Sequence, residues 1–234
     1  PLTPYLANTH NNIGFVYNKK GNLDEALKWY NKALKIDEKV LDSLSPKLAT
    51  TYNNIGAVYD TKGNLNEALK WFEKALQIRE KVSDSLSPVL ATSYSNIGLL
   101  YKAKGNLDEA LKWLNKALHI EEKVLDSLSL SLGTTYNNIG TVYVAKGNSD
   151  EALKWYDKAL EICEQVLDPL SPVLATSYNN IGTVYSDKGN YDEALKWHDK
   201  ALKIREQVLD SLSPDLAFSY NNIGSVYLSK DDYD

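Results

Sequence analysis

The feature that most constrains this chain is a sequence period of 42 residues. Glycine recurs with this spacing at Gly14, Gly56, Gly98, Gly140, Gly182 and Gly224, and all five tryptophans keep the same spacing. Periods of this length are typical of arrays in which each unit is too small to cover its own apolar faces and stacks on its neighbours. Five full repeats and part of a sixth account for the 234 residues. Because the chain lacks methionine and stops inside a repeat, we expect it to be a piece of a longer array.

Each repeat carries the signals of two helices. In the second repeat, Ser45-Pro46 supplies an N-cap residue and a proline at the first helical position, and Gly63 marks the end of the first helix. Asn64 then opens a second helix with an apolar stripe. No segment has the alternation of a strand. The sequence predicts an all-α solenoid of 11 helices in antiparallel pairs, forming a single domain over residues 1–234.

The motif Tyr-Asn-Asn-Ile-Gly-x-x-Tyr, followed by Lys-Gly-Asn-x-Asp-Glu-Ala-Leu-Lys-Trp-Tyr-x-Lys-Ala-Leu, stands at 136–143 and 146–160 and resembles the tetratricopeptide repeat. The resemblance covers essentially the whole chain. It implies a right-handed superhelix whose first helices line the concave surface.

The repeat is longer than the usual one of about 34 residues, which closes its second helix with a proline. Glutamate stands at that station in all five full repeats. Since no proline ends the second helix, we expect it to continue for about two turns, to Val40, Val82, Val124, Val166 and Val208. The longer unit is similar to the repeats of kinesin light chains, which bind cargo peptides in their groove.

Two rows of asparagine follow the first helices. On a helical wheel, Ile55 and Gly56 lie on the packed side, whereas Asn53 and Asn54 lie opposite and are expected to face the groove. The first row contains Asn11, Asn53, Asn137, Asn179 and Asn221, with Ser95 in the third repeat. The second row contains Asn12, Asn54, Asn96, Asn138, Asn180 and Asn222. An amide both donates and accepts, so such rows could bind the backbone of an extended peptide, as similar groove asparagines do in kinesin light chains.

Two interpretations of these rows remain open. The asparagines bind a peptide, or they are structural, satisfying one another or being copied passively when a repeat duplicates. The lining between the rows varies most and would select any partner; it includes Leu99, Lys102, Thr141, Val144, Thr183 and Ser186. The expected groove has few basic residues, chiefly Lys19 and Lys102, which argues against an acidic or carboxylate-ended peptide.

Composition excludes several other functions. A net charge of −5 and a pI near 5.3 argue against a nucleic-acid surface. No apolar run approaches the roughly 20 residues that a membrane helix needs. One cysteine, Cys163, excludes an internal disulfide framework and a thiolate zinc site. No asparagine stands in a glycosylation sequon, which fits a cytoplasmic protein.

No residue pattern points to catalysis, a cofactor or a metal. His10 aligns with tyrosines of other repeats, and His198 with Tyr30, so both are interpreted as packing substitutions. Cys163 aligns with Asp37 and Arg79 and is expected to be partly exposed. The repeated Asp-Glu pairs suit helix N-termini. We therefore expect a protein without enzymatic activity.

The fourth repeat departs from the others. Leu130 replaces proline, Gly133 replaces alanine, and Ser149 replaces leucine or tyrosine. All three changes lower local stability, so the helices of this repeat should fray first.

The leading hypothesis is a scaffold that binds a peptide or protein segment in the concave groove. The alternative is a structural spacer or self-assembling rod without a groove ligand. The helices expected at 4–19 and 214–229 each lack one neighbour, so we expect end-to-end self-association through their apolar surfaces.

Overall fold

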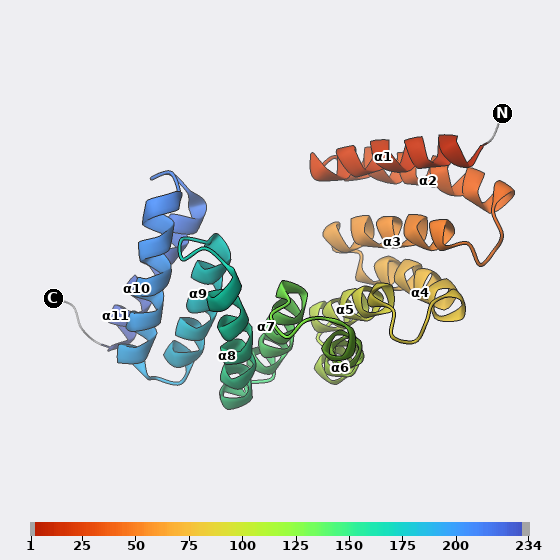
Figure 1. The fold of residues 1–234 in the computed structure, drawn as a ribbon. Helices are drawn as coiled ribbons and strands as arrows, with labels where there is room; N and C mark the ends of the chain where they lie inside the picture. Colours follow the sequence, from red (N-terminus) through yellow and green to blue (C-terminus); the bar gives the residue numbers. More distant parts are fainter. Residues whose placement is uncertain (1–2, 231–234) are drawn as a thin grey trace. The chain divides into compact units, whose positions relative to one another are not determined.

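The computed structural model describes residues 3–230, and this range contains eleven helices and no strand (Figure 1). In chain order they are α1 (Pro4–Lys19), α2 (Leu23–Val40), α3 (Pro46–Thr61), α4 (Leu65–Val82), α5 (Pro88–Ala103), α6 (Leu107–Val124), α7 (Leu130–Ala145), α8 (Ser149–Val166), α9 (Pro172–Asp187), α10 (Tyr191–Val208) and α11 (Pro214–Lys230). The all-α prediction is confirmed. None of these helices combines the length and the apolar character that crossing a membrane requires.

The chain divides into two compact parts, Pro1–Val124 and Leu125–Asp234, each described here by itself. Within each part, the two helices of a repeat make the most extensive contacts, and the second helix also packs on the first helix of the next repeat. Each part is therefore a stack of helix pairs, as expected of a solenoid. The single domain and the right-handed superhelix stay predictions.

The second helices end where the sequence indicated. The helices α2, α4, α6, α8 and α10 end at Val40, Val82, Val124, Val166 and Val208. The predicted two-turn extension is confirmed, because without a proline the backbone hydrogen bonds continue past the glutamate station.

The turn within each repeat depends on one glycine and the asparagine that follows it. Gly63 has φ +74°, a conformation that costs a side-chain-bearing residue energy. Its N–H donates to the Asp60 carbonyl at 2.8 Å, and the Asn64 N–H donates to the Tyr59 carbonyl at 2.9 Å, which together form a Schellman motif. The Asn64 side chain also accepts from the Glu67 N–H at 3.4 Å. Asn64 thus ends one helix and caps the next, whereas Asn22 and Asn190 occupy the same position without a side-chain cap.

The serines before α3, α5 and α7 make no side-chain cap, whereas Ser171 before α9 accepts from the Val173 N–H at 3.3 Å. Ser45 occupies the N-cap position before Pro46, as predicted, but its side chain makes no capping hydrogen bond. Asp42 orders the turn instead, because its Oδ1 accepts from the Leu44 N–H at 2.8 Å and its carbonyl accepts from the Ser45 N–H at 2.9 Å.

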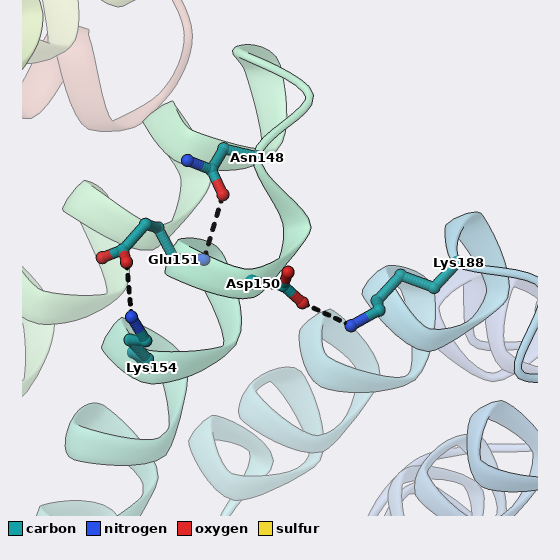
Figure 2. A network of polar contacts seen from close by, with 5 residues as sticks. All are labelled: Asn148, Asp150, Glu151, Lys154 and Lys188. Carbon is teal, nitrogen blue, oxygen red and sulfur yellow. Dashed lines mark hydrogen bonds and ion pairs between the residues drawn. The ribbon is translucent and has the colours of Figure 1, made fainter.

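Charged side chains connect successive repeats at the surface. Figure 2 shows Asn148 capping α8 through the Glu151 N–H at 3.2 Å, while Glu151 pairs with Lys154. Asp150 pairs with Lys188, the C-cap residue of α9. The same link recurs between Asp24 and Lys62. These ion pairs are largely exposed, so each contributes little to the stability of the fold.

The two helices of a repeat approach closely where the first-helix glycine meets a large side chain of the second helix. A Cβ added to Gly56 would lie 2.8 Å from the Phe72 ring, and one added to Gly140 would lie 2.6 Å from the Tyr156 ring. Gly133 is different, since its nearest neighbour would be Ile162 at 3.6 Å, an ordinary contact. Of the two glycines of α7, Gly133 therefore has room for a Cβ atom and Gly140 does not.

We predict that Gly133→Ala raises the stability of the chain by about 0.5–1 kcal/mol, because alanine fits and costs less backbone entropy than glycine within a helix. Gly140→Ala, seven residues further along the same helix, should lower stability by about 1–3 kcal/mol through overpacking. Urea and thermal unfolding of the two variants measure this difference. Equal effects of both substitutions would contradict the packing described here.

Candidate functional site

A surface hollow lies between α1 and α3. Its volume is about 390 Å³. Its walls are formed by Asn8, Asn11, Asn12, Phe15, Lys47, Thr50 and Asn54. Three of the predicted asparagines therefore line a real concavity. Lys47 adds a basic group that the sequence analysis did not place there.

The two asparagine rows are brought together, and they bond to each other. The Asn96 Nδ2 donates to the Asn53 Oδ1 at 3.3 Å, between α5 and α3. In the C-terminal part, the Asn180 Nδ2 donates to the Asn137 Oδ1 at 3.1 Å, and the Asn222 Nδ2 donates to the Asn179 Oδ1 at 2.7 Å. Each bond links the first helices of successive repeats. These contacts are what the structural interpretation of the rows requires.

The remaining asparagines of the rows differ in exposure. Asn12 and Asn221 are exposed, whereas Asn54 and Asn138 are half-buried. Asn11 donates to the Thr51 Oγ1 at 2.9 Å, which ties α1 to α3.

The predicted selectivity positions also lie on the first helices. Thr183 is exposed, and half-buried side chains occupy Leu99, Lys102, Thr141, Val144 and Ser186. The Thr141 hydroxyl donates to the Asn138 carbonyl at 2.8 Å, and the Thr183 hydroxyl donates to the Asn179 carbonyl at 3.0 Å. Both hydroxyls are therefore held by their own helices. Their role in selecting a partner stays a prediction.

The second helices also carry a row of buried polar side chains that the sequence does not predict. This row, the buried polar station, contains Asp37, Arg79, Glu121, Cys163 and Arg205. The expectation that Cys163 is partly exposed is wrong, because Cys163 is only 6% exposed. The second helix packs both on its own partner and on the next repeat, so a station that carries charge can still face inward. The signal available in the sequence was a hydroxyl 14 residues after the station, at Thr51, Ser93, Thr135, Ser177 and Ser219.

Both an acidic and a basic side chain at the buried polar station form a hydrogen bond with that hydroxyl. In the first repeat, the Thr51 hydroxyl donates to the Asp37 Oδ2 at 2.9 Å. In the second repeat, the Arg79 guanidinium donates to the Ser93 Oγ at 2.6 Å and reaches the Asn53 Oδ1 at 3.5 Å. Burial raises the pKa of Asp37 and lowers that of Arg79.

The fifth repeat repeats the arginine arrangement. The Arg205 guanidinium donates to the Ser219 Oγ at 2.5 Å and to the Asp215 carbonyl at 3.4 Å. Burial lowers the pKa of Arg205, and the charge of Asp215 opposes that shift. A buried guanidinium in this position is thus satisfied by hydroxyl, amide and carbonyl oxygens.

The histidines occupy packing positions, as predicted. His10 stacks on Trp29 with ring centroids 5.3 Å apart, as Tyr52 does on Trp71 at 5.5 Å. His198 is buried against Gly182, where the second repeat has Phe72.

His198 also joins the asparagine network, because its Nδ1 lies 3.2 Å from the Asn179 Oδ1. Burial, with a smaller effect of the Arg205 charge, lowers the pKa of His198 to about 4. The ring is therefore neutral at pH 7, with its Nδ1 placed to donate to the amide oxygen.

The described residues offer no metal chemistry of the usual kind. Across residues 3–230 there is no group of three or more histidine, cysteine, aspartate or glutamate side chains that could hold a metal ion. The polar side chains of the first helices can donate and accept hydrogen bonds.

Comparison with known proteins agrees with this architecture. A sequence profile described as tetratricopeptide repeat matches residues 5–81, 61–123, 89–165, 131–198 and 173–234. No curated protein matches the sequence.

Several solved structures share the fold at low identity. A putative kinesin light chain of Podosopora anserina with nearly identical TPR-like repeats is 22% identical, with a TM-score of 0.75 over 89% of this chain and 99% of that one. BtubC (BKLC) from P. vanneervenii is also 22% identical, with a TM-score of 0.73 over 91% and 83%. A signal transduction ATPase from Pyrococcus horikoshii with a tetratricopeptide repeat sensor is 21% identical, with a TM-score of 0.79 over 96% of this chain but 32% of that protein.

The depressed pKa of His198 predicts a pH dependence of stability. Between the unfolded-state pKa of about 6.5 and the folded-state value of about 4, the unfolded chain binds the proton and the folded chain does not, so stability falls as the pH falls. The neutral His198 is expected to contribute about 3 kcal/mol to the free energy of unfolding. This contribution is fully present above pH 6.5 and is lost progressively as the pH falls to 4.

Unfolding at a series of pH values compares the wild type with His198→Phe, the residue type that the second repeat has at this station. The variant should lose this part of the acid sensitivity. An unchanged pH profile in the variant would show that His198 is not the responsible group.

Proposed function

The chain belongs to the tetratricopeptide repeat family, whose arrays are in general scaffolds for protein interaction, and we propose that it binds an extended peptide or protein segment through the asparagine rows. The observation that carries the proposal is the hollow between α1 and α3, because Asn11, Asn12 and Asn54 meet there beside Phe15. Amides next to an aromatic ring suit a peptide, whose backbone is polar and whose side chains are in part apolar.

Hydrogen-bonding capacity supports the same proposal. An amide side chain has two N–H donors and an oxygen with two lone pairs. The bond from Asn180 to Asn137 uses one donor of Asn180, and this side chain is half-buried. This bond therefore leaves Asn180 with capacity for a ligand while fixing the orientation of its side chain, which lowers the entropy cost of binding.

A second candidate function is a structural one. The bonds between asparagines of successive repeats favour it, since they tie the first helices together without any ligand. On this account the chain is a spacer or an assembling rod. Association of copies through α1 and α11, and a cytoplasmic location, stay predictions from the sequence.

A binding selection tests the proposal. We would select peptides for the wild-type chain from a display library of random 12-residue peptides and measure their affinity for Asn12→Ala/Asn54→Ala/Asn96→Ala, a triple variant within the N-terminal part that removes two amides of the hollow. Three lost amides, at about 0.5–1.5 kcal/mol each, should weaken binding about 10- to 2,000-fold. The matched control is Asn31→Ala/Asn115→Ala, which removes exposed asparagines of the second helices and should leave the affinity unchanged.

Thermal unfolding of both variants completes the test. A triple variant that keeps its fold and loses the peptides supports the binding proposal. The opposite result would be a triple variant that unfolds at a much lower temperature but whose folded molecules bind the peptides with the affinity of the wild type and the control. That result would overturn the proposal in favour of the structural function.

A further inference from the structure

The fourth repeat contains a cavity of about 320 Å³ between α7, α8 and α9. Most of its wall is apolar and comes from Leu130, Gly133, Ala159, Leu167 and Val173. The polar part of the wall comes from Thr134, Asn137, Cys163, Thr176 and Ser177. All these residues belong to the C-terminal part of the chain.

In the second repeat, an arginine occupies the equivalent place. Cys163 stands 84 residues after Arg79, that is two repeats later, and Asn137 and Ser177 correspond in the same way to Asn53 and Ser93. Those two residues accept the Arg79 guanidinium. The fourth repeat keeps both acceptors, but a short thiol replaces the arginine.

The fifth repeat gives an independent second example. Arg205, 42 residues after Cys163, donates to Ser219, the counterpart of Ser177. The fourth repeat is further widened by Gly133, where the second and fifth repeats have Ala49 and Ala175.

The acceptors of the fourth repeat are arranged as in the occupied site. The Asn137 Oδ1 accepts from Asn180, as the Asn53 Oδ1 accepts from Asn96 while also facing Arg79. An amide oxygen has two lone pairs and can accept twice. The apolar wall suits the methylene stem that leads to a guanidinium, because such stems pack on apolar surface while the charged end is hydrogen-bonded.

We propose that this cavity receives an alkylguanidinium group, namely the side chain of an arginine in the bound partner. The proposal rests on the proposed function in that a peptide would carry the arginine. The occupied sites around Arg79 and Arg205 define the fit: the guanidinium donates to Ser177 and Asn137, and the methylenes contact Leu130 and Val173.

Cys163 supplies a site-specific readout, since it is the only cysteine of the chain and lies in the cavity wall. The experiment measures the rate at which N-ethylmaleimide modifies the folded full chain, with n-propylguanidinium as the probe. We expect n-propylguanidinium to bind with a dissociation constant of about 5 mM. At about 10 mM it should then slow the modification of Cys163 about threefold, because only about one third of the cavities remain empty.

Two small molecules and one variant serve as controls. The compound n-propylurea has the same shape without the charge, and n-butylammonium has the charge without the planar fork, so both should protect much less. Ser177→Ala removes one acceptor and also a hydrogen-bond partner of the Cys163 thiol. Protection in this variant is therefore measured as the ratio of its own rates without and with n-propylguanidinium, and this ratio should fall. Equal protection by all three molecules, or no protection by any, would overturn the proposal.

A second variant fills the cavity from within. In Cys163→Arg, the new side chain should bond to Ser177 and Asn137, and peptides selected by the wild type should bind more weakly if they contain arginine. Should this variant fail to fold, the maleimide experiment still decides, because it uses the wild type.

The maleimide assay needs no peptide. Its failure, with the asparagine rows still required for peptide binding, would remove only this inference. Protection by n-propylguanidinium, with peptide binding independent of the asparagines, would instead remove the proposed function and leave the cavity as a guanidinium site.

Discussion

The close contact between a first-helix glycine and a large second-helix side chain is the constraint on which the rest of the structure depends. The rings of Phe72 and Tyr156 lie so near Gly56 and Gly140 that a Cβ atom at either glycine would be only 2.8 or 2.6 Å from the ring. This contact fixes how near the two helices of a pair come. Asn53 and Asn54 precede Gly56 by three and two residues, so their orientation on the helix follows from the same contact. The pair is the rigid unit, and the groove surface is a consequence of it.

The buried polar station connects one pair to the next and is the most variable element of the interface. Aspartate in the first repeat and arginine in the second and fifth all bond to the same hydroxyl position. Burial disfavours the charged form of each, as the pKa directions of Asp37 and Arg79 show. A short thiol avoids that cost but leaves space unfilled. Near-identical repeats can thus differ in a cavity while keeping the same backbone.

Local signals were enough to predict the elements, and contacts between repeats were not. Gly63 and the absence of proline after Glu80 determine where α3 and α4 end, and both effects act within a few residues. The alignment of Cys163 with Asp37 and Arg79 predicts exposure, but a helix packed on two sides can bury a charged station, and Cys163 is buried. The bond between Asn53 and Asn96 depends on the distance between α3 and α5, which is set by packing across repeats and is not encoded in the motif. The fold was therefore predictable from the sequence, and the hydrogen bonds of the asparagine amides were not.

The central claim is that the asparagine rows contact a bound peptide, and the side-chain amide signals of these residues test it most directly. A selected peptide that carries a nitroxide label should broaden the NMR signals of the Asn54 and Asn96 side-chain amides and leave that of the exposed Asn115 of α6 unchanged. Broadening of the Asn115 signal with the Asn54 and Asn96 signals unaffected would contradict the account.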